Sequence, residues 1–438
     1  MSVSLLESAI REHLALKRRT GAHEAELADA EALVGERRQP APPALGTGPP
    51  RPGPPPARGR RIRALARLAR RHKLRTALVA VPLLLVTPLV SYSEAMLKPS
   101  DASLGVRSIE WLRDHGMAWL VSDVENAYYS INAPAKGGAA LRALPRVGVA
   151  APRGHATGAV EPARIAPVIR PALPGEGVWR PTGARVAGAP PVLVTTFRPD
   201  RDYPRVVAGV AWIDSSRTRT VLYPGRYQPP SASSRGPLEV PPGRRRALVA
   251  TFNSGFKLQD AQGGGFVTGG QVDAPLSRGQ ATLVAYRDGR VDVLRWQGPA
   301  RPGPDVLWAR QNLPLIVDGG RANPNLSDGS QWGVTLGNAI RVWRSGVGVD
   351  RHGNLLYAAA NDQTVGSLAQ ILIRAGAVRA MELDINSYWV SFISYGPRGP
   401  ANLLPDMQRS SDRYLTTSDR DFLAVYRRPP ARAGVATP

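Results

Sequence analysis

The apolar and polar positions between residues 341 and 360 predict two strands joined by a turn. Apolar runs occupy 341–349 and 355–360. The polar segment 350–354 between them contains glycine and asparagine, which favour tight turns. This arrangement is typical of a β-hairpin.

The residues that follow the hairpin predict a helix. Val365, Leu368 and Leu372 recur with the spacing of one apolar helical face. Ser367 and Gln370 have the spacing of a capping box, and Gly376 stands where a helix is expected to end.

The chain then extends again over 377–384 and ends on two acids, Glu382 and Asp384. Side chains two apart on a strand share one face, so these carboxylates are expected to project the same way, about 7 Å apart at the backbone. Paired carboxylates at about this separation carry out the hydrolysis of glycosidic bonds. The alternative interpretation is two solvated acids at the end of a strand.

Short apolar runs separated by turn signals continue through residues 177–427. The dipeptide Asp288-Gly289, between two such runs, is a hairpin signal. Because the helix at 365–375 is the one strong helical pattern in this region, we predict the α+β class: a sheet-dominated globular domain behind an N-terminal membrane helix.

The segments outside that domain differ sharply in composition. Residues 1–38 predict either a cytoplasmic helix or a tail without a stable fold. Residues 39–57 are rich in proline and glycine and cannot build a core. The predicted segments are a cytoplasmic helical or disordered tail (1–38), a linker (39–57), a basic juxtamembrane segment (58–76), a transmembrane signal anchor (77–95), a helix and irregular connector (96–176), the globular domain (177–427) and a disordered tail (428–438).

The anchor is predicted from the uncharged run at 77–90, which follows the basic run 58–75. A spanning helix usually needs about 20 residues, so the core of a signal peptide with a cleavage site at 93–95 is an alternative, as is a buried core helix. The long leader and the basic flank favour an uncleaved anchor with a cytoplasmic N-terminus and an extracellular C-terminal domain.

Composition narrows the function further. The formal net charge is +23, but the densest basic run adjoins the apolar segment, which favours a membrane surface over nucleic acid as its partner. The chain has no cysteine, which excludes disulfides, thiolate metal sites and a cysteine nucleophile. We therefore expect no nucleic-acid partner and no cofactor.

Several polar residues interrupt apolar surroundings in the predicted domain. Asn253 and Asp318 each follow a strand-like run, and Arg344 precedes the glycines at 346 and 348, which would let a ligand approach the backbone. A turn is the alternative role for Asn253 and Asp318. Segment 323–329 is only faintly similar to a calcium loop, so no metal is predicted. Tryptophans at 332, 343 and 389 are candidates for sugar stacking or, more simply, for core packing.

Four motifs in this order resemble the phosphodiester glycosidase domain family, in its bacterial membrane-anchored branch. They are T-F-N-S-G-F (251–256), L-I-V-D-G-G (315–320), R-S-G-V-G-V-D-x-x-G-x-L (344–355) and M-E-L-D (381–384). The resemblance covers roughly residues 190–427.

The resemblance implies roles for single residues. Asp384 and Glu382 would be the catalytic carboxylates, with acid and base unassigned, while Asn253 would position the sugar and Arg344 would hold phosphate. The predicted substrate-binding set also includes three residues: Asp318, Asn361 and Asn386.

The chain departs from the family pattern at these positions. Glu382 stands where the family has asparagine, residues 385–388 replace a Gly-Gly-Gly-Ser loop, and Asn361-Asp362 replaces an Asp-Gly pair. We therefore expect a membrane-anchored extracytoplasmic hydrolase acting on a glycosyl phosphodiester or related cell-surface glycan. A non-catalytic glycan-binding or envelope-assembly protein is the alternative.

Overall fold

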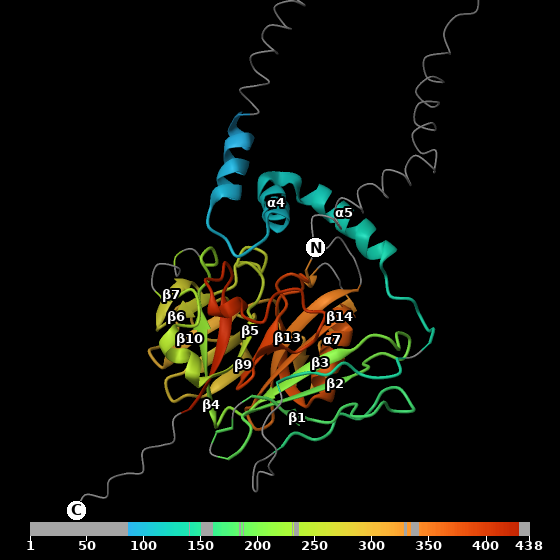
Figure 1. Cartoon of the computed structure of the whole chain (residues 1–438). Coiled ribbons are helices and arrows are strands. Elements are labelled where there is room, and N and C mark those ends of the chain that lie inside the picture. Colours follow the sequence, from blue (N-terminus) through green and yellow to red (C-terminus); the bar gives the residue numbers. More distant parts are fainter. Residues whose placement is uncertain are drawn as a thin grey trace, which may run out of the picture. The chain divides into compact units, whose positions relative to one another are not determined.

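The computed structural model describes residues 86–139, 141–149, 161–183, 185–186, 188–229, 231, 236–327, 331–333 and 341–428. Its contacts divide these into two compact units. Residues 86–99 and 103–121 form a helical unit, and residues 100–102 and 122 onwards form the globular domain (Figure 1). The predicted segments 1–38, 39–57 and 58–76 lie outside the described residues.

The helical unit contains a helix at 86–97 and the helix α4 (Leu104–Leu112). Ser103 caps α4, because its side chain accepts from the Val106 amide. A π-helical turn with Gly116 at φ 80° (Arg113–Met117) leads into α5 (Ala118–Ile131), which runs on into the domain. Within the described residues, no helix combines the length and the apolar character needed to cross a bilayer. Residues 77–85 of the predicted anchor at 77–95 lie outside the described residues.

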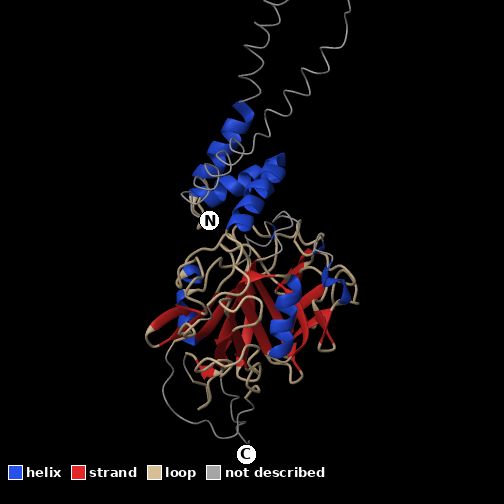
Figure 2. Ribbon diagram, turned by 90° about the vertical axis from the view of Figure 1, so that its right-hand side faces the viewer, coloured by secondary structure: helices blue, strands red, loops and turns tan. Residues whose placement is uncertain are grey.

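Strands make up most of the regular secondary structure of the domain, as Figure 2 shows, and this agrees with the predicted sheet-dominated α+β class. Every strand pair is antiparallel. The eight-stranded sheet has the order β1 (Arg180–Pro181), β2 (Val192–Phe197), β3 (Ala208–Ile213), β14 (Leu355–Gln363), β13 (Val342–Asp350), β15 (Ala377–Glu382), β11 (Val317–Asp318), β12 (Arg321–Ala322).

Two five-stranded sheets complete the domain. One has the order β7 (Gln271–Ala274), β6 (Phe266–Thr268), β10 (Val306–Gln311), β8 (Ala281–Tyr286), β9 (Val291–Arg295). The other has the order β17 (Gly399–Asn402), β16 (Phe392–Gly396), β5 (Leu248–Asn253), β18 (Phe422–Arg427), β4 (Thr218–Tyr223). Short 3-10 helices lie at η2 (Pro242–Ala247), η3 (Pro324–Ser327) and η6 (Arg413–Leu415).

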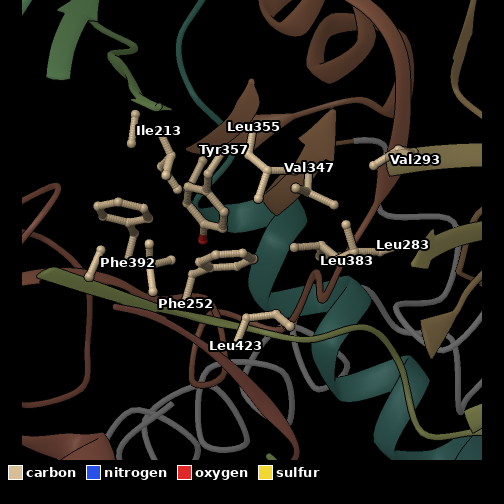
Figure 3. Close-up of a cluster of buried hydrophobic side chains, with 14 of the residues drawn as sticks. Ile213, Phe252, Leu283, Val293, Val347, Leu355, Tyr357, Leu383, Phe392 and Leu423 are labelled. Atoms are coloured by element: carbon tan, nitrogen blue, oxygen red, sulfur yellow. The ribbon is translucent and has the colours of Figure 1, made fainter. Parts of the chain in front are cut away.

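The eight-stranded sheet has a different partner on each face. One face packs against α7 (Val365–Arg374), whose buried residues share a core with Ala358 and Ala380. The other face packs against both five-stranded sheets, in a core that includes Phe252, Leu283 and Val347. Figure 3 shows this second core, with the Tyr357 ring among apolar side chains. Because successive strand residues point to opposite faces, neighbours in sequence enter different cores.

Several predicted elements are confirmed by the structure. The hairpin at 341–360 is β13 and β14, the turn at Asp288-Gly289 joins β8 to β9, and the predicted helix is α7, followed by Gly376 at φ 100°. The predicted capping box was wrong by one turn. Thr364 is the N-cap, and it exchanges hydrogen bonds with Ser367.

Candidate functional site

The first part of the candidate site is a buried ion pair at one end of the eight-stranded sheet. Glu382, the last residue of β15, accepts from Arg344 Nη1 through Oε1 at 2.5 Å. Arg344 also donates to the carbonyl oxygens of Gln363 (2.9 Å) and Trp332 (3.3 Å). Glu382 is 0% exposed, and its Oε2 has no hydrogen-bond partner among the residues that the structure describes.

The second part surrounds Asp384, two residues beyond Glu382. Arg420 Nη2 donates to Asp384 Oδ2 at 3.1 Å, and the Asn386 amide donates to Oδ1 at 2.9 Å. Arg420 also donates to the Gly255 carbonyl oxygen at 3.1 Å. Asp384 therefore has more donors than Glu382, and they favour its ionised form.

The third part centres on Asn253, the last residue of β5. Its Nδ2 donates to Ser345 Oγ at 3.0 Å, and its Oδ1 accepts from Tyr357 Oη at 2.8 Å and from the Ser391 amide at 3.0 Å. Ser345 in turn donates to the Asp384 carbonyl oxygen at 2.7 Å. A continuous hydrogen-bond chain thus joins Asn253 to the backbone of Asp384.

The sheet separates Asn253 from the Arg344–Glu382 pair. Glu382 is paired with Gly346, and a Cβ on Gly346 would meet Leu372 of α7 at 3.0 Å, so Arg344 and Glu382 lie on the α7 face. Ser345 points to the opposite face, where it meets Asn253. The structure therefore brings together Arg344 with Glu382, and Asn253 with the Asp384 backbone, from opposite faces of one sheet end.

The two carboxyl groups have unusual protonation properties. Burial raises the pKa of Glu382 to about 7, although the Arg344 charge opposes this shift and the Asp384 charge adds to it. Burial also raises the pKa of Asp384, against the opposing charge of Arg420. The charge of Asp384 thus contributes to the raised pKa of Glu382. The two carboxyl groups interact electrostatically, as the members of acid/base pairs do.

The remaining predicted site residues lie in three different places. Asn386 accepts from the Tyr388 amide at 2.9 Å, which shapes the turn after Asp384. Asn361 lies near the end of β14 and accepts from the Asp362 amide at 2.9 Å. Asp318 is exposed, and because Val317 pairs with Ala380, it lies toward the end of β15 that is remote from Glu382. The structure thus does not bring Asp318 to the cluster.

Sequence reasoning missed the arginines that surround Trp389. Arg409, Arg413 and Arg420 lie over its ring at 5.5, 5.0 and 5.3 Å from the centroid. The sequence feature that could have revealed these arginines is segment 409–421, where arginine and aspartate recur without an apolar periodicity. Trp389 is 2% exposed. Trp332 and Trp343 are also buried, and both belong to the hydrophobic cores, which confirms the core-packing interpretation for these two.

The described residues contain no group of three or more histidine, cysteine, aspartate or glutamate side chains able to hold a metal ion. In the segment with faint similarity to a calcium loop, Asn323 donates to the Leu315 carbonyl oxygen at 2.7 Å and accepts from the Asn325 amide at 3.0 Å. Asn323 thus serves the turn around η3.

Part of the globular domain matches a known family model. Residues 246–384 match the family model described as phosphodiester glycosidase, which confirms the family resemblance identified from the four motifs. The bacterial membrane-anchored branch stays a prediction. The match begins just before β5 and ends at Asp384, so it includes Asn253, Arg344 and both carboxylates.

Among solved structures, the chain is similar to the zebrafish N-acetylglucosamine-1-phosphodiester alpha-N-acetylglucosaminidase catalytic domain auto-inhibited by its pro-peptide. The identity is 14%, the TM-score is 0.38, and the match covers 56% of this chain and 87% of that one. A protein from Synechocystis is 13% identical, with a TM-score of 0.33 and coverage of 57% of this chain and 64% of that one. No curated protein matches the chain.

Proposed function

We propose that this protein is a membrane-anchored extracytoplasmic hydrolase that cleaves a glycosyl phosphodiester or a related cell-surface glycan. The observation that carries the proposal is the pair of buried carboxyl groups in the matched family segment, Glu382 and Asp384. Each is bound to its own arginine: Glu382 to Arg344, and Asp384 to Arg420. Hydrolysis of a glycosyl bond needs one carboxyl group that gives a proton and one that stays ionised.

The hydrogen bonds support a division of roles between the carboxyl groups. Glu382 has one oxygen without a partner, and burial raises its pKa to about 7, so it is suited to be the general acid. Asp384 receives donors on both oxygens, so it is suited to be the base or nucleophile. We assign Asn253 to sugar positioning through the Ser345–Asp384 connection.

In this scheme Arg344 couples binding of the substrate phosphate to protonation of Glu382, the general acid. Its guanidinium is bound to Glu382, so a substrate phosphate would compete with that carboxylate. Transfer of Arg344 to the phosphate would remove the charge that opposes protonation of Glu382. Substrate binding would thereby prepare the general acid.

The test is the release of free sugar from the methyl ester of a sugar 1-phosphate, which is a glycosyl phosphodiester. We expect Asp384→Asn to lower turnover about 10²–10⁴-fold, since it removes the ionised partner. The matched control is Asp288→Asn, the same change in the exposed β8–β9 turn, which we expect to keep full turnover. Equal turnover by a correctly folded Asp384→Asn variant would remove Asp384 from the mechanism.

The burial of the site favours the second candidate, a non-catalytic glycan-binding or envelope-assembly protein. Both carboxylates are at most 5% exposed, and residues 385–388 lack the glycines of the family loop. This candidate predicts glycan binding without turnover by the unmodified protein, and binding that survives Asp384→Asn.

A further inference from the structure

A cleft of about 640 Å³ lies in the globular domain and includes neither Glu382 nor Asp384 among its lining residues. Its walls come from four segments: 134–145, 203–207, 361–362 and 404–406. This volume falls within the range of small-molecule binding sites, about 300–1,000 Å³. The cleft is thus large enough for a ligand of its own.

The lining of the cleft combines an apolar wall with two acids. Prolines, leucines and valines supply most of it, among them Pro134, Leu144 and Leu404. Asp362 and Asp406 supply the carboxylates. A largely apolar site with a few polar groups is the usual form of a site that orients a small ligand.

Neither carboxylate has a counter-ion among the described residues. Arg341, whose charge acts on Asp362, is itself bound to Asp200 at 2.9 Å. It also donates to the Asp362 carbonyl oxygen at 3.0 Å and stacks on Tyr203 at 3.7 Å. Arg205 also lines the cleft, but the charges that act on Asp362 are those of Arg341 and Asp406.

The electrostatics of the cleft therefore favour a positive ligand. Burial raises the pKa of Asp362 to about 6, against the opposing charge of Arg341, and the negative charge of Asp406 adds to the rise. Burial raises the pKa of Asp406 as well. Two like charges in a partly desolvated wall repel each other, and a cation between them would remove that repulsion.

Asp362 also adopts an unusual backbone conformation. Its φ of 58° lies in the left-handed region, which residues other than glycine rarely adopt. Such conformations persist where the surrounding structure holds them, often at functional sites. Here the conformation lets Asp362 line the cleft while its carbonyl oxygen accepts from Arg341.

We propose that this cleft binds a sugar that bears a free amine, with the ammonium group between Asp362 and Asp406 and the ring against the prolines and leucines. The proposal rests on the proposed glycan-cleaving function. Asp362 is followed directly by Gln363, whose carbonyl oxygen accepts from Arg344 of the candidate site, so the cleft adjoins that site along β14. A glycan bound at the candidate catalytic site would place a neighbouring sugar unit near the cleft.

Direct binding measurements on the purified full-length protein test this proposal without any turnover. The probes are glucosamine and N-acetylglucosamine, which differ in whether the amine carries a charge. By calorimetry at pH 7, we expect glucosamine to bind at least about tenfold more tightly than N-acetylglucosamine, because only the ammonium group of glucosamine forms charge-assisted hydrogen bonds to the two carboxylates.

The variants locate the binding. Asp362→Asn and Asp406→Asn are each expected to weaken glucosamine binding about tenfold or more, and asparagine tolerates the left-handed conformation at 362. Asp288→Asn, in the exposed turn between β8 and β9, is expected to leave binding unchanged.

Three results would overturn the proposal: equal binding of the two sugars, glucosamine binding that neither variant weakens, or binding of calcium or putrescine with none of glucosamine. Failure of the proposed function is a separate result. If Asp384→Asn kept full turnover while glucosamine bound as expected, the catalytic assignment would fall and the cleft assignment would stand.

Discussion

Glu382 and Asp384 are two residues apart on one strand end, yet their surroundings make them chemically different. Glu382 is buried with one arginine, whereas Asp384 has Arg420 and the Asn386 amide as donors. The positions of both acids could be read from the sequence, because a strand with period two was evident there. Their donors come from residues 36 to 38 positions away or from the following turn, so only tertiary folding reveals them.

The raised pKa of Glu382 predicts a particular dependence of stability on pH. An acid with a raised folded-state pKa binds its proton more tightly in the folded protein, so its stabilising contribution is complete below pH 4.5 and is lost as the pH rises to about 7. The loss is on the order of 3 kcal/mol. We expect Glu382→Gln to abolish this part of the pH dependence, measured by urea unfolding between pH 4.5 and 8.

The matched control for that measurement is Glu161→Gln, which changes an exposed glutamate in the same way. It is expected to keep the pH dependence of the unmodified protein. A Glu382→Gln variant whose unfolding free energy fell as much over this range as that of the unmodified protein would show that other groups are responsible.

At the scale of elements, the glycines of β13 serve packing. The sequence suggested that Gly346 and Gly348 let a ligand approach the backbone. In the structure, a Cβ on Gly348 would lie 2.7 Å from the Arg379 carbonyl oxygen, and one on Gly346 would meet Leu372. These glycines therefore allow β15 and α7 to approach β13 closely.

This close packing predicts opposite effects for two glycine substitutions. Gly348→Ala is expected to destabilise the domain by about 1–3 kcal/mol, because the backbone of β15 must shift. Gly366→Ala, within α7, meets only Thr364 Oγ1 at 3.7 Å and is expected to be neutral or to stabilise by up to about 1 kcal/mol. Urea midpoints of both variants check this, and equal midpoints would contradict it.

Local pattern was a good guide to the elements and a poorer guide to their ends. The helix at 365–374 was evident from its apolar period, but the cap was assigned to Ser367 when Thr364 holds that position. Both residues have hydroxyl side chains, and the choice between them depends on where β14 ends. That end is determined by pairing with β13, which is a non-local contact.

At the scale of the whole molecule, membrane anchoring through 77–95 stays a prediction. We expect the full-length protein to sediment with membranes and to require detergent for release, while a chain beginning at residue 96 is expected to remain in the supernatant. The physical reason is the transfer of the uncharged run 77–90 into hydrocarbon. Full-length protein that stayed in the supernatant without detergent would contradict the anchor.

The sequence by itself determined the strands, the main helix, the family resemblance and the two acids, because these depend on period and on residue order within short segments. The three-dimensional structure alone decided which side chains meet. Arg344 binds Glu382 on one face of the eight-stranded sheet, and Asn253 binds Ser345 on the other. Arg420 binds Asp384, whereas Asp318 lies away from these residues. These contacts depend on the order of the strands in the sheet and on the face that each residue occupies. Neither property is determined by the sequence of a single segment.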